Sequence, residues 1–311
     1  MPRVFDKKNI ILLRINENDI NSFLVDTDIN DQGQPEYQLD EFTKAIINTI
    51  PEYVYAQYIE PNDHQTDLVD KLRLAAKSIY KIKEVELMKR WYVDSDQAAY
   101  EQLNKAGYTS RGEFGELILH LLLRDFKETI PLVSKVYFKD AAGVPAHGFD
   151  AVHISPDEEI LWLGESKFYT DCKQGLRELI KDLKCHFKKD YLDEQFTIIK
   201  KNLEVNNIPQ RDEWIQILSN CNKLSDRIRI INIPVLCTYP HNIYSLYPEV
   251  NCEEAIEYHE ANIRDMKRFF DEQNDHSLKS QLNVILLLFP VKDKHELVKK
   301  LHERLWHMQS M

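Results

Sequence analysis

The sequence predicts a mixed α/β fold, with a central mixed sheet flanked by helices and an acidic α/β extension at the N-terminus. Of its 311 residues, 43% are hydrophobic, which is enough for a substantial core, and the few glycines argue against disorder. Between residues 109 and 239 the apolar periodicity gives one helix, three strands, a helix and a strand, the pattern of a sheet covered by helices. The length predicts one large domain or two unequal ones.

The first hundred residues are predicted to begin with a strand at 9–15. A polar, turn-rich stretch follows at 26–37, and helices are expected at 39–50 and 67–80. The predicted domain boundary lies between 95 and 110, giving an N-terminal region of residues 1–105 and a second region of residues 106–311.

The second region changes rhythm, starting with Thr109 and Ser110 as candidate N-caps of a strongly apolar helix. Three strands, a helix, two further strands and a closing helix follow. The predicted helices are 109–126, 171–189 and 292–307, and the predicted strands are 133–140, 149–155, 160–169, 228–239 and 282–291.

The negative charge is concentrated at the N-terminus. Residues 1–70 hold 5 Lys and Arg against 14 Asp and Glu, whereas the rest of the chain is nearly balanced within a total of −11. Three interpretations stay open for this acidity: an ordinary solvated surface, an interface for a partner protein, or a screen over a nucleic-acid channel. Residues 1–105 are therefore predicted to be a regulatory or partner-binding region.

Several classes of protein are disfavoured. The five cysteines are odd in number and form no CxxC pair, which argues against a disulfide framework or a structural zinc site and favours a reducing cytosol. No signal peptide is visible at the N-terminus. The longest apolar run, at 284–291, is far shorter than the roughly 20 residues that cross a bilayer. We expect a cytoplasmic protein without a membrane partner.

Two carboxylates and an ammonium are predicted to meet on one hairpin. Asp150 begins one strand, and Glu165 and Lys167 lie two residues apart on the next, so they project from the same face. The polar turn near 156–159 folds the strands together and brings Asp150 beside Glu165. This grouping suits phosphodiester hydrolysis.

The predicted cofactor is Mg²⁺, with Mn²⁺ as the alternative and no small-molecule cofactor. Paired carboxylates hold a hard, oxygen-preferring cation that keeps open positions for water and phosphate. A neighbouring lysine can orient the attacking water or stabilise charge in the transition state. Asp150 and Glu165 are thus candidate metal ligands, and Lys167 is the candidate catalytic cation.

These residues resemble the PD-(D/E)XK nuclease superfamily: Asp150, a 14-residue interval, then Glu165-Ser166-Lys167 behind a helix with an acidic first turn. The match covers roughly residues 109–239, but the proline is not adjacent to the aspartate here. The resemblance implies a restriction-endonuclease-like core within residues 106–311. It also implies a further acid from the preceding helix, Glu116 or Glu113; Glu116 is preferred as a catalytic and metal residue because it lies deeper in the helix.

A closer resemblance is to the HamA family, carried by the segments SRGEFGELILHLLL, HGFDAVHIS and LWLGESKFY. HamA is the nuclease subunit of the Hachiman anti-phage system and acts with a helicase, HamB. The resemblance implies a deoxyribonuclease of phage defence whose partners are DNA and a HamB-like helicase.

A basic stripe follows the motif on the helix 171–189. Its cations are three or four residues apart and occupy an arc of about 80°, beside an apolar face that would pack on the sheet. Such a stripe suits a phosphate backbone, although a solvated helix face is the commoner role. The candidate nucleic-acid-binding residues are Lys173, Gln174, Arg177, Lys181, Lys184 and Lys188.

Other residues near the motif favour structural roles. His147 and His153 flank Asp150, and His153 has the wrong strand parity to join it. Gly112 and Gly115 lack a phosphate-binding loop pattern around them. Strand parity offers weak support for Tyr169 as a substrate contact.

Two rival functions stay open. One is a catalytically degenerate adaptor that keeps the fold to dock a helicase or DNA. The other is a stand-alone DNA repair or restriction endonuclease. The choice of DNA over RNA and the mode of cleavage are not fixed by these residues.

Overall fold

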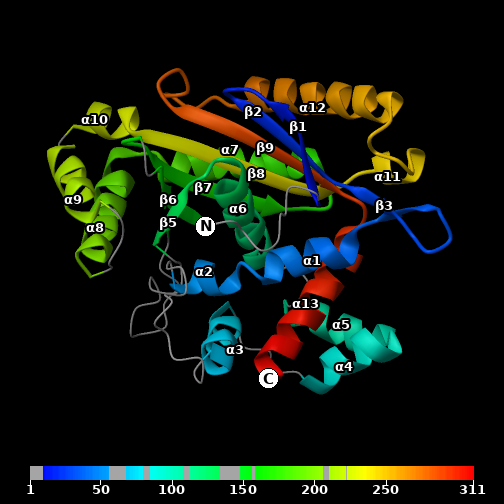
Figure 1. Ribbon diagram of the computed structural model, residues 1–311. Helices are drawn as coiled ribbons and strands as arrows, with labels where there is room; N and C mark the ends of the chain where they lie inside the picture. The colour runs from blue at the N-terminus through cyan, green and yellow to red at the C-terminus, as the bar shows by residue number, and fades with distance from the viewer. Residues whose placement is uncertain are drawn as a thin grey trace.

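A seven-stranded mixed sheet forms the centre of the computed structural model, in the order β1-β2-β9-β8-β7-β6-β5 (Figure 1). Its strands are β1 (Ile11–Asn16), β2 (Ile20–Val25), β5 (Ile130–Val133), β6 (Ala151–Ile154), β7 (Leu161–Phe168), β8 (Ile231–Pro240) and β9 (Asn283–Val291). The residues that the structure describes are 10–55, 68–79, 85–107, 112–133, 148–155, 158–205, 210–221 and 223–311.

The sheet has a parallel middle and antiparallel edges. β7, β8 and β9 run parallel to one another, and β2 joins β9 in parallel. β1 pairs antiparallel with β2 at one edge, and β5 and β6 continue antiparallel from β7 at the other. The mixed sheet predicted from the sequence is confirmed.

Burial on both faces explains the continuous apolar runs of the central strands. In β9 every residue from Ile285 to Val291 is buried. In β8 every residue from Ile233 to Tyr239 is buried as well. The apolar stretch near 284–291 is therefore a core strand, as expected.

One face of the sheet is covered by α6 (Glu113–Phe126), with further helices outside it. These helices share a hydrophobic core with sheet residues such as Phe23, Leu236 and Phe289. In Figure 1 they lie below the sheet. The outer helices are α1 (Leu39–Ile47), α2 (Ile50–Tyr55), α3 (Leu68–Ile79), α4 (Val85–Asp94), α5 (Gln97–Lys105) and α13 (Lys294–Ser310).

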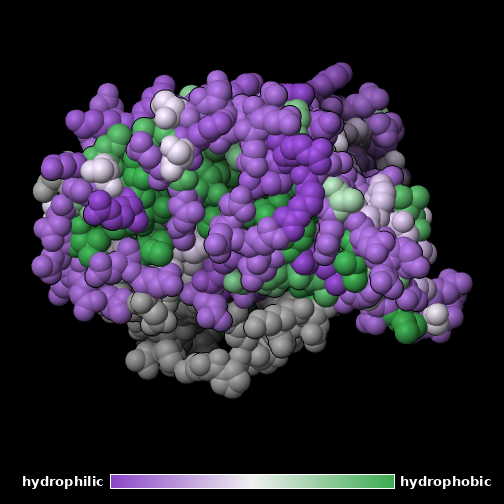
Figure 2. Space-filling view, turned by 90° about the horizontal axis from the view of Figure 1, so that it is seen from above, coloured by the Kyte–Doolittle hydropathy of each residue, from purple (hydrophilic) through white to green (hydrophobic). Residues whose placement is uncertain are grey.

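The other face is covered by α7 (Cys172–His186), α8 (Lys189–Val205), α9 (Arg211–Asn220) and α12 (Glu253–Gln273). They share a second core with sheet residues such as Leu163, Val235 and Leu286. The view from above in Figure 2 shows mostly hydrophilic side chains, with smaller hydrophobic areas between them. The protein thus has helices on both faces of one sheet.

Two predicted elements need correction. The stretch 26–37 contains a small hairpin of β3 (Thr27–Ile29) and β4 (Pro35–Tyr37), in which Gly33 adopts φ +74°. The strand predicted at 228–239 begins only at Ile231, because the preceding residues form helix α10 (Leu224–Arg229). Asp226 caps that helix: its carboxylate accepts a hydrogen bond from the Lys223 amide at 3.1 Å. The alternation of Ile228 and Ile230 therefore resembles a strand pattern, but the chain is helical up to Arg229.

Other predicted elements shift at their ends. The helix expected at 39–50 is divided into α1 and α2. The structure also contains elements that were not predicted: β2, α4, α5, α8, α9, α11 (Ile243–Leu246) and α12. The strand expected at 133–140 lies outside the described residues except at Val133, where β5 ends. Thr109, Ser110 and His147 also lie outside the described residues.

The two predicted regions share the sheet. β1 and β2 come from residues 1–105, and Ile20–Ser22 of β2 pair with Leu286–Leu288 of β9. α1 and α3 pack on the C-terminal helix α13 through Ala45, Ala76 and Leu301 of the common core. The domain boundary near residue 105 stays a prediction. The segments on its two sides pack against each other in one sheet and one core.

Candidate active site

β7 presents Glu165 and Lys167 toward α7. Both residues have the strand parity of Leu161 and Leu163, which belong to the core beneath α7. Glu165 is 2% exposed, and its Oε1 is hydrogen bonded to His186 Nδ1 at 2.5 Å. Lys167 forms an ion pair with Asp182, one turn earlier on α7. The predicted carboxylate and ammonium are therefore side by side, each held by α7.

Asp150 joins them from the neighbouring strand. Its amide donates to Gly164 O at 2.9 Å, which places it opposite Glu165 at the start of β6. Its carboxylate Oδ2 accepts from the backbone amide of Ser166 at 2.9 Å and from Ser166 Oγ at 3.0 Å. Asp150 therefore lies against the Glu165-Ser166-Lys167 segment, as the sequence predicted.

The buried surroundings of Glu165 raise the pKa of its carboxyl group. Burial is the largest cause, and the charges of Asp150 and Asp182 add to it, so the pKa of Glu165 rises to about 7 although the hydrogen bond from His186 opposes this. The pKa of His186 is raised, because its contact with Glu165 outweighs burial. Two carboxylates this close in a buried site are an arrangement that a cation would relieve.

Lys167 keeps its charge in this setting. Burial alone would lower the pKa of Lys167, but the ion pair with Asp182 and the charges of Asp150 and Glu165 raise it. An ammonium fixed next to two carboxylates can orient a water molecule or meet a phosphate oxygen.

Glu116 lies on α6, which covers the opposite face of β7. A Cβ added at the adjacent Gly115 would lie 3.3 Å from Ser166 Oγ, so this turn of α6 packs closely on β7. Glu116 is 7% exposed, and its Oε2 accepts a hydrogen bond from Tyr53 of α2 at 2.5 Å. Burial and the charges of Glu116, Asp150 and Glu113 raise the pKa of Tyr53 well above its usual range. Tyr53 is thus within range of the charges of Glu113 and Glu116 on α6 and of Asp150 beside β7.

The donor set fits a hard cation only in part. Asp150 and Glu165 supply the carboxylate oxygens that Mg²⁺ prefers. Within the described part of the chain, however, no group of three or more His, Cys, Asp or Glu side chains is arranged to hold a metal ion. Glu116 as a third ligand, like the metal roles of Asp150 and Glu165, stays a prediction.

The basic stripe of α7 does not face the carboxylates. Asp182 and His186, which do, are roughly opposite the stripe on a helical wheel. Lys173 and Arg177 lie over the Phe269 ring of α12, at 5.3 and 5.1 Å from its centroid.

The remaining cations of the stripe have other surroundings. Lys181 pairs with Glu178 of its own helix, and Lys184 pairs with Asp275 just beyond α12. Lys188 and Gln174 are exposed. Contact of the stripe with nucleic acid stays a prediction.

Four residues of the site were not foreseen. His186, Asp182 and Tyr53 supply hydrogen-bonding or ionic partners, and Ser166 ties Asp150 to the motif. The four-residue spacing of Asp182 and His186, on the face of α7 away from its cations, is a signal the sequence contains. Nothing in the sequence near Tyr53 indicates its partner.

Neither His153 nor a cysteine takes part in the hydrogen bonds and the ion pair that hold Asp150, Glu165 and Lys167 in the described part of the chain. His153 Nε2 and His120 Nδ1 are hydrogen bonded at 3.0 Å, and His153 is 1% exposed, which fits the structural role favoured for it. All five cysteines are free thiols, as expected. None of the helices in the described ranges is long and apolar enough to cross a membrane.

The fold and this site define a mixed α/β protein with a partly buried carboxylate–lysine cluster on its central sheet. The HamA family model matches residues 3–305, nearly the whole chain, and the chain belongs to the HamA family. Membership makes the protein a component of the Hachiman anti-phage defence system, which includes a helicase partner. No curated protein and no solved structure matches the chain significantly.

Proposed function

We propose that this protein is a Mg²⁺-dependent deoxyribonuclease of the PD-(D/E)XK type, which hydrolyses DNA phosphodiester bonds under the control of its helicase partner in the cytoplasm. The observation that carries the proposal is the meeting of Asp150, Glu165 and Lys167 at one end of a buried hairpin. Family membership supports the defence context.

The roles follow from the surroundings of each side chain. Asp150 and Glu165 would hold the cation, which would supply Lewis-acid chemistry at the scissile phosphate. Lys167, oriented by Asp182, positions the attacking water and stabilises charge on the phosphate. Ser166 fixes the Asp150 carboxylate, and His186 fixes that of Glu165. Glu116 supports the site from α6.

A second candidate is a nuclease-fold adaptor without catalysis. It is favoured by one observation: the described side chains contain no ready cluster of three metal ligands. The site acids instead engage the protein's own Ser166, His186 and Tyr53. In the nuclease proposal, the same contacts hold the carboxylates in the positions from which they would bind the cation.

Cleavage assays separate the two candidates. The protein is incubated with plasmid and with linear DNA, in Mg²⁺ or in EDTA, with and without the helicase. The nuclease proposal predicts cleavage in Mg²⁺ that EDTA abolishes. It also predicts that the cleavage rate depends on the presence of the helicase. Tight binding of the helicase without cleavage under any of these conditions would favour the adaptor.

A further inference from the structure

Helix α2 contacts one face of α6 along two full turns. Glu116, His120 and Arg124 are spaced four residues apart and therefore lie in a row on α6. Tyr53 of α2 donates to Glu116 Oε2 at 2.5 Å, and its ring meets that of His120 edge-on at 5.7 Å. The neighbouring Glu52 accepts from Arg124 Nη1 at 2.7 Å. Two consecutive residues of α2 thus contact all three.

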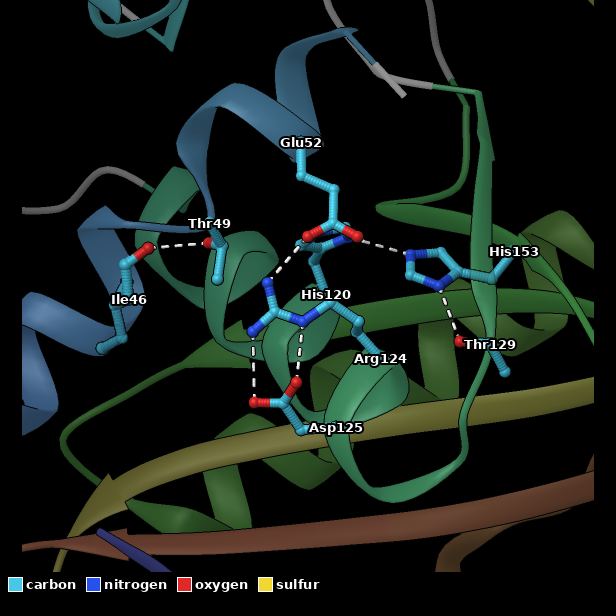
Figure 3. Close-up of polar contacts among 8 residues, drawn as sticks. All are labelled: Ile46, Thr49, Glu52, His120, Arg124, Asp125, Thr129 and His153. Atoms are coloured by element: carbon cyan, nitrogen blue, oxygen red, sulfur yellow. Dashed lines mark hydrogen bonds and ion pairs between the residues drawn. The ribbon is translucent and has the colours of Figure 1, made fainter. Parts of the chain in front are cut away.

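The Glu52 end of this contact belongs to a buried polar network (Figure 3). Arg124 donates to both carboxylate oxygens of Asp125, at 2.7 and 3.1 Å. Its side chain is 9% exposed and that of Glu52 is 11% exposed. A buried ion pair of this kind fixes geometry strongly, because breaking it leaves a charge unpaired.

The same network reaches the strand that follows Asp150. His120 Nε2 lies 3.8 Å from Glu52 Oε2, and its Nδ1 is hydrogen bonded to His153 of β6. His153 Nδ1 is in turn hydrogen bonded to Thr129 Oγ1 at 2.8 Å (Figure 3). Burial lowers the pKa of both histidines, so they are neutral near pH 7. The network therefore connects α2 and α6 to His153 of β6, the strand that directly follows Asp150.

The phenol of Tyr53 is buried in the core that α2 and α6 share. Its hydroxyl donates a hydrogen bond to Glu116 Oε2, and this contact fixes the direction of the Glu116 carboxylate.

We infer that Tyr53 is a positioning residue of the nuclease site, which α2 supplies from the N-terminal region, and that the Glu52–Arg124 ion pair holds α2 in register with α6. Tyr53 orients Glu116 without touching the reacting atoms. Glu52 acts one step further away by fixing the helix that carries Tyr53. This inference rests on the proposed function, and it assigns a task in the site to a helix that lies outside the motif.

The test compares Tyr53→Phe, Glu116→Gln and the double variant with the wild type, on plasmid DNA in Mg²⁺ with the helicase present. Tyr53→Phe should lower kcat by about 10- to 100-fold and leave KM for DNA nearly unchanged, because a misdirected carboxylate impairs the chemical step. The double variant should be no slower than Glu116→Gln alone, since both changes remove one interaction.

Tyr244→Phe is the matched control. Tyr244 is a buried tyrosine whose hydroxyl donates to Pro290 O and accepts from the amide of Val25, at the far side of the sheet. Loss of the Tyr244 hydroxyl should lower the free energy of unfolding by about as much as Tyr53→Phe does, without changing kcat. Glu52→Gln is a second variant, and it should lower kcat with Tyr53 still in place.

The outcomes are distinguishable. Cleavage by the wild type together with full activity of Tyr53→Phe and Glu52→Gln would overturn this inference alone. Independent, multiplying losses in Tyr53→Phe and Glu116→Gln would overturn it as well. If the wild type cleaves no DNA under any condition, the proposed function fails, and this inference fails with it.

Discussion

At the scale of single residues, the site is a set of paired side chains. Asp150 is held by Ser166, Glu165 by His186 and Lys167 by Asp182. Each pairing satisfies a polar group that would otherwise be costly to bury. The pairing partner is thus as much part of the site as the motif residue.

The His186 contact gives a prediction for stability. Replacing His186 with Ala leaves the Glu165 carboxyl buried beside Asp150 without its hydrogen-bond partner. We expect the free energy of unfolding at pH 7 in EDTA to fall by about 1–3 kcal/mol. Urea unfolding measures it, with the exposed His307 replaced by Ala as a control. Equal stability of both variants would mean that the contact contributes nothing.

The motif residues were predictable because strand parity and hairpin geometry are local. Glu165 and Lys167 share strand parity, and Asp150 lies opposite Glu165 on the neighbouring strand, with its carboxylate hydrogen bonded to Ser166. Their partners were harder to foresee. Tyr53 reaches Glu116 across 63 residues of sequence, and no periodicity encodes such a contact. His186 and Asp182 were obscured by the more conspicuous cations of the same helix.

At the scale of elements, close helix–sheet packing sets the geometry of the site. At Gly164 of β7, an added Cβ would lie 2.9 Å from Leu119 Cδ2 of α6 and 3.2 Å from Pro234 Cγ of β8. The absence of a side chain at this position therefore lets α6 approach the strand that carries Glu165 and Lys167.

Gly164→Ala should therefore be destabilising. We expect a loss of about 1–3 kcal/mol in the free energy of unfolding, as for other overpacked core sites. Gly112→Ala is the matched control, because a Cβ there meets no atom within 4 Å. Thermal and urea unfolding of both variants check this. A Gly164→Ala protein as stable as the control would contradict the packing described for α6.

The contact between α2 and α6 should make stability depend on pH. Burial opposes ionisation of Glu52, but His120 and Arg124 prevail and lower its pKa from 4.5 to about 2. A depressed pKa in the folded state stabilises the protein above pH 4.5, and this contribution is lost as the pH falls toward 2. It amounts to at most about 3 kcal/mol.

Urea unfolding of the wild type and Glu52→Gln between pH 7 and pH 3 measures this contribution. The stability difference between them should be largest at pH 5–7 and shrink below about pH 4.5. A difference that stays constant down to pH 3 would show that Glu52 is not held in its ionised form by α6.

Prediction of the elements succeeded where periodicity is strong and failed where capping decides. The strands β6, β7 and β9 and the helices α6 and α7 lie close to their predicted positions. By contrast, the predicted strand 228–239 starts two residues inside α10, because Ile228 and Ile230 alternate like strand residues although Asp226 caps a short helix there. The hairpin of β3 and β4 was not predicted, because residues 26–37 are polar and rich in turn-forming residues.

At the scale of the whole molecule, the sheet joins the N-terminal region to the segment with the motif. β2 lies against β9, and α1, α2 and α3 complete the core that α6 and α13 form beneath the sheet. The sequence suggested a division between residues 95 and 110, where the pattern of helices and strands changes. Such a pattern is local, whereas the sheet order depends on pairing between distant strands, which a local pattern does not reveal.

A truncated chain tests how far the two regions are independent. Residues 106–311 alone would lack β1 and β2, which exposes the edge of β9. They would also lack Phe42, Ile46 and Ile50, which exposes the core side chains that pack against these residues. We expect this fragment to aggregate or to unfold without cooperativity. Circular dichroism and sedimentation would check it. Cooperative unfolding of a monomeric fragment would establish residues 106–311 as an autonomous domain.

The central claim is that Glu165 belongs to a metal-dependent site that cleaves DNA. Its most direct test is the cleavage rate of Glu165→Gln on plasmid DNA in Mg²⁺ with the helicase, beside the exposed-residue control Glu194→Gln. The account predicts a loss of at least about 100-fold for Glu165→Gln and wild-type rates for the control, because the amide cannot replace a carboxylate toward the cation. Wild-type cleavage by Glu165→Gln would contradict it.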